Sequence, residues 1–328
     1  MRMAFRNVLF AVLLGATGVA LADVPPSQLL EGVRGDLTQG LADQGLQALG
    51  QVLAQDPQNA EAHNLQCRIY LQEQRWSDAI RACQAAVKLM PDNSNYHLWL
   101  ARALGEKADR VSFITAFKMA KQIHVEFETA AKLDPHSVNA LSDLGEFYVD
   151  APGIVGGGLD KAGKVAQQLD ALAPDRAHYI RARIAENQKD YAQAEEEYKA
   201  AIAGSKEPAD AWMDLASFYR RRARYEDMIQ AVHKGAALDT QHGVAAADGA
   251  SVLIRANRDL PFARELLEQY LASSNKSEDA PAFQTHVQLG KLLSGMGDAP
   301  GAQQQFAAAV ELAKDYQAGT QAATNSGR

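Results

Sequence analysis

The sequence lacks the short motifs that mark most families of enzymes. It has no Gly-x-Ser-x-Gly segment for a nucleophilic serine, no His-Glu-x-x-His pair for zinc and no phosphate loop ending in Gly-Lys-Ser or Gly-Lys-Thr. The glycine-rich segment 153–158 (GIVGGG) has a different spacing from the dinucleotide-binding fingerprint. These absences argue against hydrolytic and nucleotide-dependent chemistry, and we expect a protein that is not an enzyme and binds no cofactor.

The chain is also short of positive charge and of clustered metal ligands. Its 33 lysines and arginines are outnumbered by 40 aspartates and glutamates, which gives a net charge of −7. Nucleic acid is therefore not expected as a partner, since phosphate binding requires a basic field. The eight histidines are scattered along the sequence without a close pair, so no metal site is predicted.

The sequence has only one long apolar run, and it lies at the N-terminus. Val8 to Ala22 is apolar, follows Arg2 and Arg6, and ends in the small-residue sequence Ala20-Leu21-Ala22. This order is typical of a secretory signal peptide, whereas a transmembrane helix needs about 20 apolar residues. We expect residues 1–22 to be removed and the mature chain to be soluble and periplasmic, not membrane-spanning.

The rest of the chain repeats one pattern about every 34 residues. Each copy predicts two helices, for example 60–73 and 76–89, because apolar residues recur at helical spacing on both sides of a polar bend. Small residues occupy the places where the two helices would cross most closely. The clearest copies contain Trp212, Leu215, Ala216, Tyr219, Tyr225, Met228 and Ala231; Leu289, Gly290, Leu293, Ala302, Phe306 and Ala309; and Cys67, Tyr70, Trp76, Ala79, Ala86 and Pro91.

This pattern resembles the tetratricopeptide repeat, whose signature has bulky, small and aromatic residues at these offsets. The resemblance implies an all-α, right-handed superhelical solenoid of helix-turn-helix repeats over residues 23–314. In such a solenoid each repeat contacts only its neighbours. The sequence divides into eight units: 26–57, 60–91, 94–135, 138–174, 175–206, 209–240, 244–275 and 283–314.

Two units carry insertions, and a polar tail follows the last unit. The insertion near 106–115 predicts a lengthened helix pair that projects beyond the stack. Residues 151–158 (APGIVGGG) predict a flexible or tightly turned loop that is peripheral to the fold. The tail, residues 315–328, is polar and small, and we expect it to be flexible.

The resemblance also places the two cysteines of the chain opposite each other. Cys67 takes a small-residue position on the first helix of its unit, and Cys83 takes the aromatic position on the second helix. Facing cysteines in an oxidising compartment are expected to form a disulfide. The loop that it closes would contribute about 3 kcal/mol in the chain-entropy model. The alternative is a pair of reduced core cysteines that act as small hydrophobic residues.

In this family the first helix of each pair lines the concave surface, which implies a set of groove positions here. Five basic residues among them would form a strip suited to binding carboxylates, so an acidic partner is predicted. The alternative is a solvated face that offsets nearby acids. The strip contains Arg183, Arg220, Arg221, Arg255 and Lys291, and the other groove positions are Tyr179, Asn187, Asp210, Met213, Ser217, Asp248 and Val252.

The most consistent function is a scaffold or adaptor of the bacterial cell envelope that holds a protein or peptide segment in its concave groove. Two alternatives remain open. One is a small-ligand-binding or enzyme-accessory protein, with the glycine loop and residues 106–125 framing a pocket. The other is a self-assembling structural scaffold. The identity of the partner and the oligomeric state do not follow from the sequence.

Cleavage after Ala22 is the first testable prediction. Sequencing the N-terminus of the protein purified from an expressing Gram-negative cell should give Asp23 as the first residue, in the periplasmic fraction. A chain that begins at Met1 in the cytoplasmic fraction would contradict both the signal peptide and the envelope location.

Overall fold

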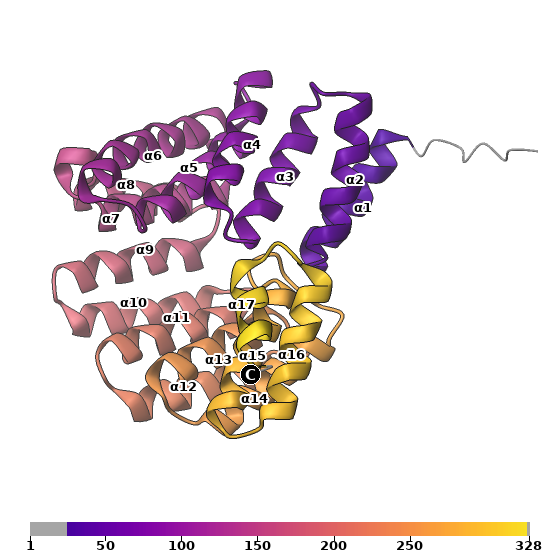
Figure 1. Cartoon of the computed structure of the whole chain (residues 1–328). Helices are drawn as coiled ribbons and strands as arrows, with labels where there is room; N and C mark the ends of the chain where they lie inside the picture. The colour runs from indigo at the N-terminus through magenta and orange to yellow at the C-terminus, as the bar shows by residue number, and fades with distance from the viewer. Residues whose placement is uncertain (1–24, 327–328) are drawn as a thin grey trace, which may run out of the picture.

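Pairs of neighbouring helices make up the described part of the chain. The computed structural model describes residues 25–326, and these contain 17 α-helices, the short 3-10 helix η1 and no β-strand. Helices α1 to α16 form eight consecutive pairs along a curved path (Figure 1), which confirms the expected all-α solenoid. The helices are α1 Pro26–Gln39, α2 Ala42–Gln55, α3 Ala60–Gln72, α4 Trp76–Leu89, α5 Ser94–Ala108, α6 Phe113–Leu133, α7 Val138–Asp150, α8 Leu159–Leu169, α9 Pro174–Asn187, α10 Tyr191–Gly204, α11 Pro208–Arg221, α12 Tyr225–Leu238, α13 Val244–Ala256, α14 Leu260–Ala272, α15 Ala282–Gly295, α16 Ala299–Leu312 and α17 Gln317–Ser326; η1 is Gly153–Val155.

The predicted signal peptide, residues 1–22, lies outside the described residues. Among residues 25–326, no helix combines the length and the apolar character needed to cross a membrane.

Small side chains set the distance between the two helices of a pair. Ala79, Ala194 and Ala302 occupy the same place in α4, α10 and α16, and all three are buried. In the first pair Gly45 of α2 takes this place. A Cβ atom there would lie 3.5 Å from Cβ of Asp36 in α1 and 2.7 Å from Cδ1 of Ile69 in α3 of the next pair. The repeat phase inferred from the sequence therefore agrees with the packing.

The two insertions lie side by side and pack on each other. Helix α6 has 21 residues, against 15 in α5, and the α7–α8 loop that contains η1 contacts it. Within this loop Val155 is buried, and a Cβ atom on Gly157 would lie 1.7 Å from the carbonyl oxygen of Ala151. The loop is thus a packed turn that needs glycine for steric reasons. The prediction that this loop is peripheral to the fold is therefore wrong at Val155, whose side chain is buried.

The C-terminal residues also differ from the sequence-based expectation. The sequence predicts a flexible tail, but residues 317–326 form α17, which packs against α15 and α16. Tyr316 precedes this helix, is buried, and lies edge-on to Phe283 at 5.1 Å between ring centroids. One aromatic anchor within a polar sequence therefore attaches the segment to the last repeat. Residues 327 and 328 lie outside the described range.

The two ends of the solenoid meet. The side-chain amide of Gln72 in α3 donates to the carbonyl oxygens of Leu37 and Glu278, each at 3.0 Å. Arg68 Nε donates to the Glu278 carboxylate at 3.1 Å, and Gln284 in α15 donates back to the carbonyl oxygen of Gln72. Figure 1 shows α15 to α17 returning beside α1 to α3. The expectation that each repeat contacts only its neighbours is therefore wrong for the terminal repeats.

Apolar packing and one glycine complete this closure. A single cluster of buried apolar side chains contains Leu37 and Ile69 from the first repeats together with Phe283 and Tyr316 from the last. Gly40 ends α1 with φ of +73°, and a Cβ atom there would lie 2.5 Å from the backbone nitrogen of Ala282. Only glycine combines this backbone conformation with so close an approach.

A buried acid lies at the edge of the closure. The Glu73 side chain is fully buried beside Arg75, whose Nη1 contacts both the Glu73 carboxylate and that of Asp315 at 3.3 Å. Burial, opposed by Arg75 and reinforced by Asp315 and Asp43, raises the pKa of Glu73 to about 7. One carboxylate oxygen of Glu73 has no hydrogen-bond partner, so its charged form is poorly solvated.

Cys67 and Cys83 are joined by a disulfide between α3 and α4. The bond connects the two helices of the second repeat across a sequence separation of 16 residues. It lies in the repeat whose α3 makes the closure contacts, so it stiffens the N-terminal side of that junction.

Ala302→Trp should strongly destabilise the fold. The added volume has no space at the helix crossing and should cost about 1–3 kcal/mol or more. The matched control is Ala307→Trp on the same helix, where the side chain is exposed, and this change should stay within about 0.5 kcal/mol. Thermal unfolding followed by circular dichroism measures both. Equal melting temperatures for the two variants would contradict the repeat phase.

Glu73→Gln should change the pH dependence of stability. The folded state holds the Glu73 proton more tightly than the unfolded chain does, so the wild type loses stability as the pH rises through about 7. Glutamine carries no such proton. The difference in unfolding free energy between variant and wild type should therefore move in favour of the variant from pH 5 to pH 8, by up to about 3 kcal/mol. Urea titrations at the two pH values measure it, and a pH-independent difference would refute the assignment.

Candidate binding cavity on the inner face

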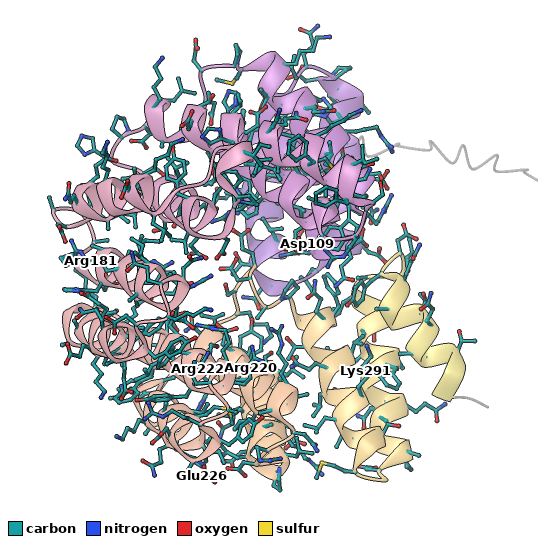
Figure 2. The ribbon with its side chains drawn as sticks, turned by 90° about the vertical axis from the view of Figure 1, so that its left-hand side faces the viewer. Asp109, Arg181, Arg220, Arg222, Glu226 and Lys291 are labelled. Atoms are coloured by element: carbon teal, nitrogen blue, oxygen red, sulfur yellow. A yellow bond between two sulfur atoms is a disulfide. The ribbon has the colours of Figure 1, made fainter. Side chains whose placement is uncertain are left out.

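The first helices of three consecutive repeats surround a cavity of about 630 Å³. Helices α11, α13 and α15 line it, and the turn before α15 closes one side. The wall includes three cations, Arg220, Arg255 and Lys291, which come one from each helix. Figure 2 labels two of them, Arg220 and Lys291. The repeat itself explains their grouping, because equivalent positions of successive units lie next to each other.

These three cations have no acidic partner within residues 25–326. None of their side chains forms an ion pair or a hydrogen bond there, and Arg255 and Lys291 are exposed. The Nε atom of Arg220 is buried and has no hydrogen-bond partner. Burial and the neighbouring Arg255 and Arg221 lower the pKa of Arg220. The cavity thus holds three cations that form no ion pair with the described residues of the chain.

An acidic band lies on the other side of the same cavity. Asp214 on α11 and Asp248 on α13 precede the arginines of their helices by six and seven residues, which is about 10 Å along a helix. Burial together with the neighbouring acids raises the pKa of Asp248 to about 7 and that of Asp214 to about 6. Asp210, which adds to this field, has a pKa raised to about 6. The cavity is therefore bipolar.

Two arginines of the predicted strip are occupied by partners within the chain. Arg183 donates to the Asp150 carboxylate at 2.8 Å and to the Tyr179 hydroxyl at 3.2 Å. Arg221 forms two hydrogen bonds with the carboxylate of Glu186, at 3.0 and 2.6 Å. These contacts hold neighbouring repeats together, so the structure separates the five predicted cations into two structural arginines and three free cations.

The remaining predicted groove residues divide in the same way. Met213, Ser217, Asp248 and Val252 line the cavity with the three cations. Asn187 lies away from it and donates its side-chain amide to the carbonyl oxygen of Val149 at 3.2 Å.

Sequence reasoning missed a second, adjacent cavity of about 490 Å³. Its main feature is Trp99, whose ring lies between two guanidinium groups, Arg68 at 4.8 Å and Arg102 at 4.7 Å from the ring centroid. The two cavities share Gln74, Asp279 and Gln284 of the closure region. A signal was present, since Arg68 and Arg102 are the ninth residues of their units, the place that the predicted groove residue Arg183 takes in its own unit.

Comparisons with known proteins agree with this architecture. Models of the tetratricopeptide repeat match residues 36–104, and residues 156–208 and 179–236. No curated protein matches the chain in sequence.

Among solved structures, yeast Tom70 has a TM-score of 0.57 at 15% identity, over 93% of this chain and 64% of that one. The chain thus spans less than two thirds of the length of Tom70. A thermophilic tetratricopeptide repeat protein from Thermus thermophilus has a TM-score of 0.49 at 17% identity, over 63% of this chain and 100% of that one. A tetratricopeptide repeat protein from Parabacteroides merdae has 0.43 at 12%, over 92% and 99%.

Proposed function

We propose that this chain, which belongs to the tetratricopeptide repeat family, is a protein-binding scaffold of the bacterial cell envelope. Members of this family are typically non-catalytic interaction scaffolds. In our proposal a segment of a partner protein lies along the inner face of the solenoid and enters the bipolar cavity between α11, α13 and α15. No covalent step is involved.

The observation that carries this proposal is the set of three unpaired cations around one cavity. Arg220, Arg255 and Lys291 face a common space, and within residues 25–326 the chain supplies no carboxylate to any of them. An acidic side chain of a partner would supply it, and arginine binds carboxylates through two parallel hydrogen bonds. Acidic residues of the partner would thus occupy the basic side of the cavity.

The acidic side of the cavity adds a second requirement on the partner. Asp248 is exposed, and its pKa is raised because protein atoms surround it and neighbouring acids repel its charge, whereas Asp214 already contacts Arg176 at 3.7 Å. A lysine or arginine of the partner, about 10 Å from its acidic residue, would relieve this repulsion. The favoured partner is therefore an extended segment that carries both signs of charge rather than a uniformly acidic one.

Two features support the envelope setting. The sequence predicts an N-terminal signal peptide. The Cys67–Cys83 disulfide belongs to the chemistry of an oxidising compartment.

Arg255→Glu/Lys291→Glu should weaken capture of the partner severalfold. The experiment is crosslinking in intact cells, followed by purification and quantitative mass spectrometry of the captured proteins. Both residues are exposed, so the melting temperature should stay close to that of the wild type. Raising the salt concentration should weaken wild-type capture too, because partly exposed charges are screened over about 8 Å in physiological buffer.

Lys88→Glu/Lys164→Glu is the matched control. It makes the same change of charge at two exposed lysines on α4 and α8 that lie outside the cavity, and it should leave capture unchanged. Equal capture by the wild type and the Arg255/Lys291 variant would refute the cavity as the binding site.

A further inference from the structure

The two insertions of the solenoid enclose a groove that the bipolar cavity does not include. Its volume is about 1190 Å³, the largest of the cavities described here. One wall is the first half of α6, and the other is formed by α7 and the loop to η1. The end of α5 closes one side, where Gly105, Glu106 and Phe127 border both this groove and the cavity at Trp99. Figure 1 shows α5 to α8 gathered in this part of the molecule.

The lips of this groove carry the three most exposed large apolar side chains of residues 25–326. Phe113 is 83% exposed, Ile154 is 74% exposed and Ile114 is 71% exposed. Phe113 and Ile114 begin α6, and Ile154 lies across from them in η1. Between the lips the floor contains Ile123 and Phe127, which are already buried. An apolar surface concentrated in this way, rather than scattered singly, marks an interaction site.

Charged side chains border the apolar floor of the groove. Five carboxylates line the groove, Glu106, Asp109, Asp143, Glu146 and Asp150, against two lysines, Lys118 and Lys121.

Most of these acids already have a partner on another helix or turn. Asp143 receives Arg102 at 2.6 Å, and Asp150 receives Arg183 at 2.8 Å. Asp109, labelled in Figure 2, forms no ion pair within residues 25–326. Asp109 is thus the lining acid that is left for a basic residue of the partner beside its apolar face.

The dimensions of the groove fit a helix better than a small molecule. From Phe113 to Phe127 the wall extends over 15 residues of α6, or about 21 Å, which is roughly four helical turns. Small-molecule sites are usually about 300–1,000 Å³ and enclose most of their ligand. Here the lips stand in solvent, so an occupant would bury one face and leave the other in water. That is how an amphipathic helix binds in a groove.

We propose that this groove docks an amphipathic helix of a protein partner, of about four turns. Its apolar face would cover Phe113, Ile114 and Ile154, and a lysine or arginine on its flank would face Asp109. This site is separate from the bipolar cavity, and the proposal does not rest on the function proposed for that cavity. One partner could use both sites, because the Trp99 cavity connects them.

The test is selection from a random 16-residue peptide library displayed on phage, with the mature protein as target. Enriched sequences should carry apolar residues at the spacing i, i+3 or i+4, and i+7, together with lysine or arginine. A selected peptide is then synthesised with a fluorescent label, and its affinity is measured by anisotropy. Phe113→Ser/Ile114→Ser should weaken binding at least about tenfold, and Asp109→Lys should weaken it severalfold.

Several variants separate this site from the rest of the molecule. Leu238→Ser/Met296→Ser removes two exposed apolar side chains outside the groove and should leave the affinity unchanged. Arg255→Glu/Lys291→Glu should also leave it unchanged, even if the bipolar cavity has no partner. Ile154→Ser tests the opposite lip. It replaces Phe113→Ser/Ile114→Ser if circular dichroism shows that this double variant is unfolded.

Other outcomes would overturn the proposal. These are the absence of enriched peptides, enrichment of acidic peptides or of peptides without apolar periodicity, and equal affinity for the Phe113/Ile114 variant. If no peptide is enriched and palmitate binds in a 1:1 ratio, and if Phe113→Ser/Ile114→Ser abolishes this binding, the groove would be assigned to acyl chains. If the mass in light scattering rises with protein concentration, and Phe113→Ser/Ile114→Ser abolishes this rise, the groove would be assigned to a second copy of this chain.

Discussion

The contact between the first and last repeats is the constraint on which the rest of the structure depends. A solenoid held only by nearest-neighbour packing can flex along its length. Here Gln72, Glu278 and Gln284 connect α3 to the segment around the start of α15, and one apolar cluster contains side chains from both ends. The same residues border the inner cavities, since Gln284 lines both and Glu278 lines the one at Trp99. Closure therefore fixes the curvature and shapes the cavities at the same time.

The parallel order of the repeats explains how charges are distributed inside this frame. First helices of successive units point the same way, so acids near their middle and arginines in their last turn form two bands. Basic residues in the last turn also interact favourably with the helix dipole. This effect does not depend on whether they form an ion pair. Arg183 and Arg221 are used to join repeats, whereas Arg220 and Arg255 are left to the cavity. Whether a groove arginine is paired or unpaired thus depends on which acids the neighbouring repeat supplies.

The two insertions modify the solenoid at one place and give it a surface of different chemistry. Helix α6 extends past its partner α5, and the turn at η1 rises to meet it. Because these elements have no further repeat to cover them, Phe113, Ile114 and Ile154 stay exposed. The molecule therefore combines a bipolar inner cavity with an apolar groove, and the two need different features of a partner.

The sequence by itself determined the repeat, its phase and the pairing of helices, since these depend on local periodicity and on small residues such as Ala79 and Ala302 at fixed offsets. It also placed Cys67 opposite Cys83, because both lie within one unit. Only the tertiary structure decided which groove arginines are free. Asp150 and Glu186 lie at groove positions of the preceding repeats, and the repeat pattern assigns positions without saying which side chains pair across repeats. The tertiary structure alone showed the closure and the anchoring of α17 by Tyr316. These depend on contacts between residues more than 200 positions apart, or on a single buried side chain, and neither leaves a periodic signal.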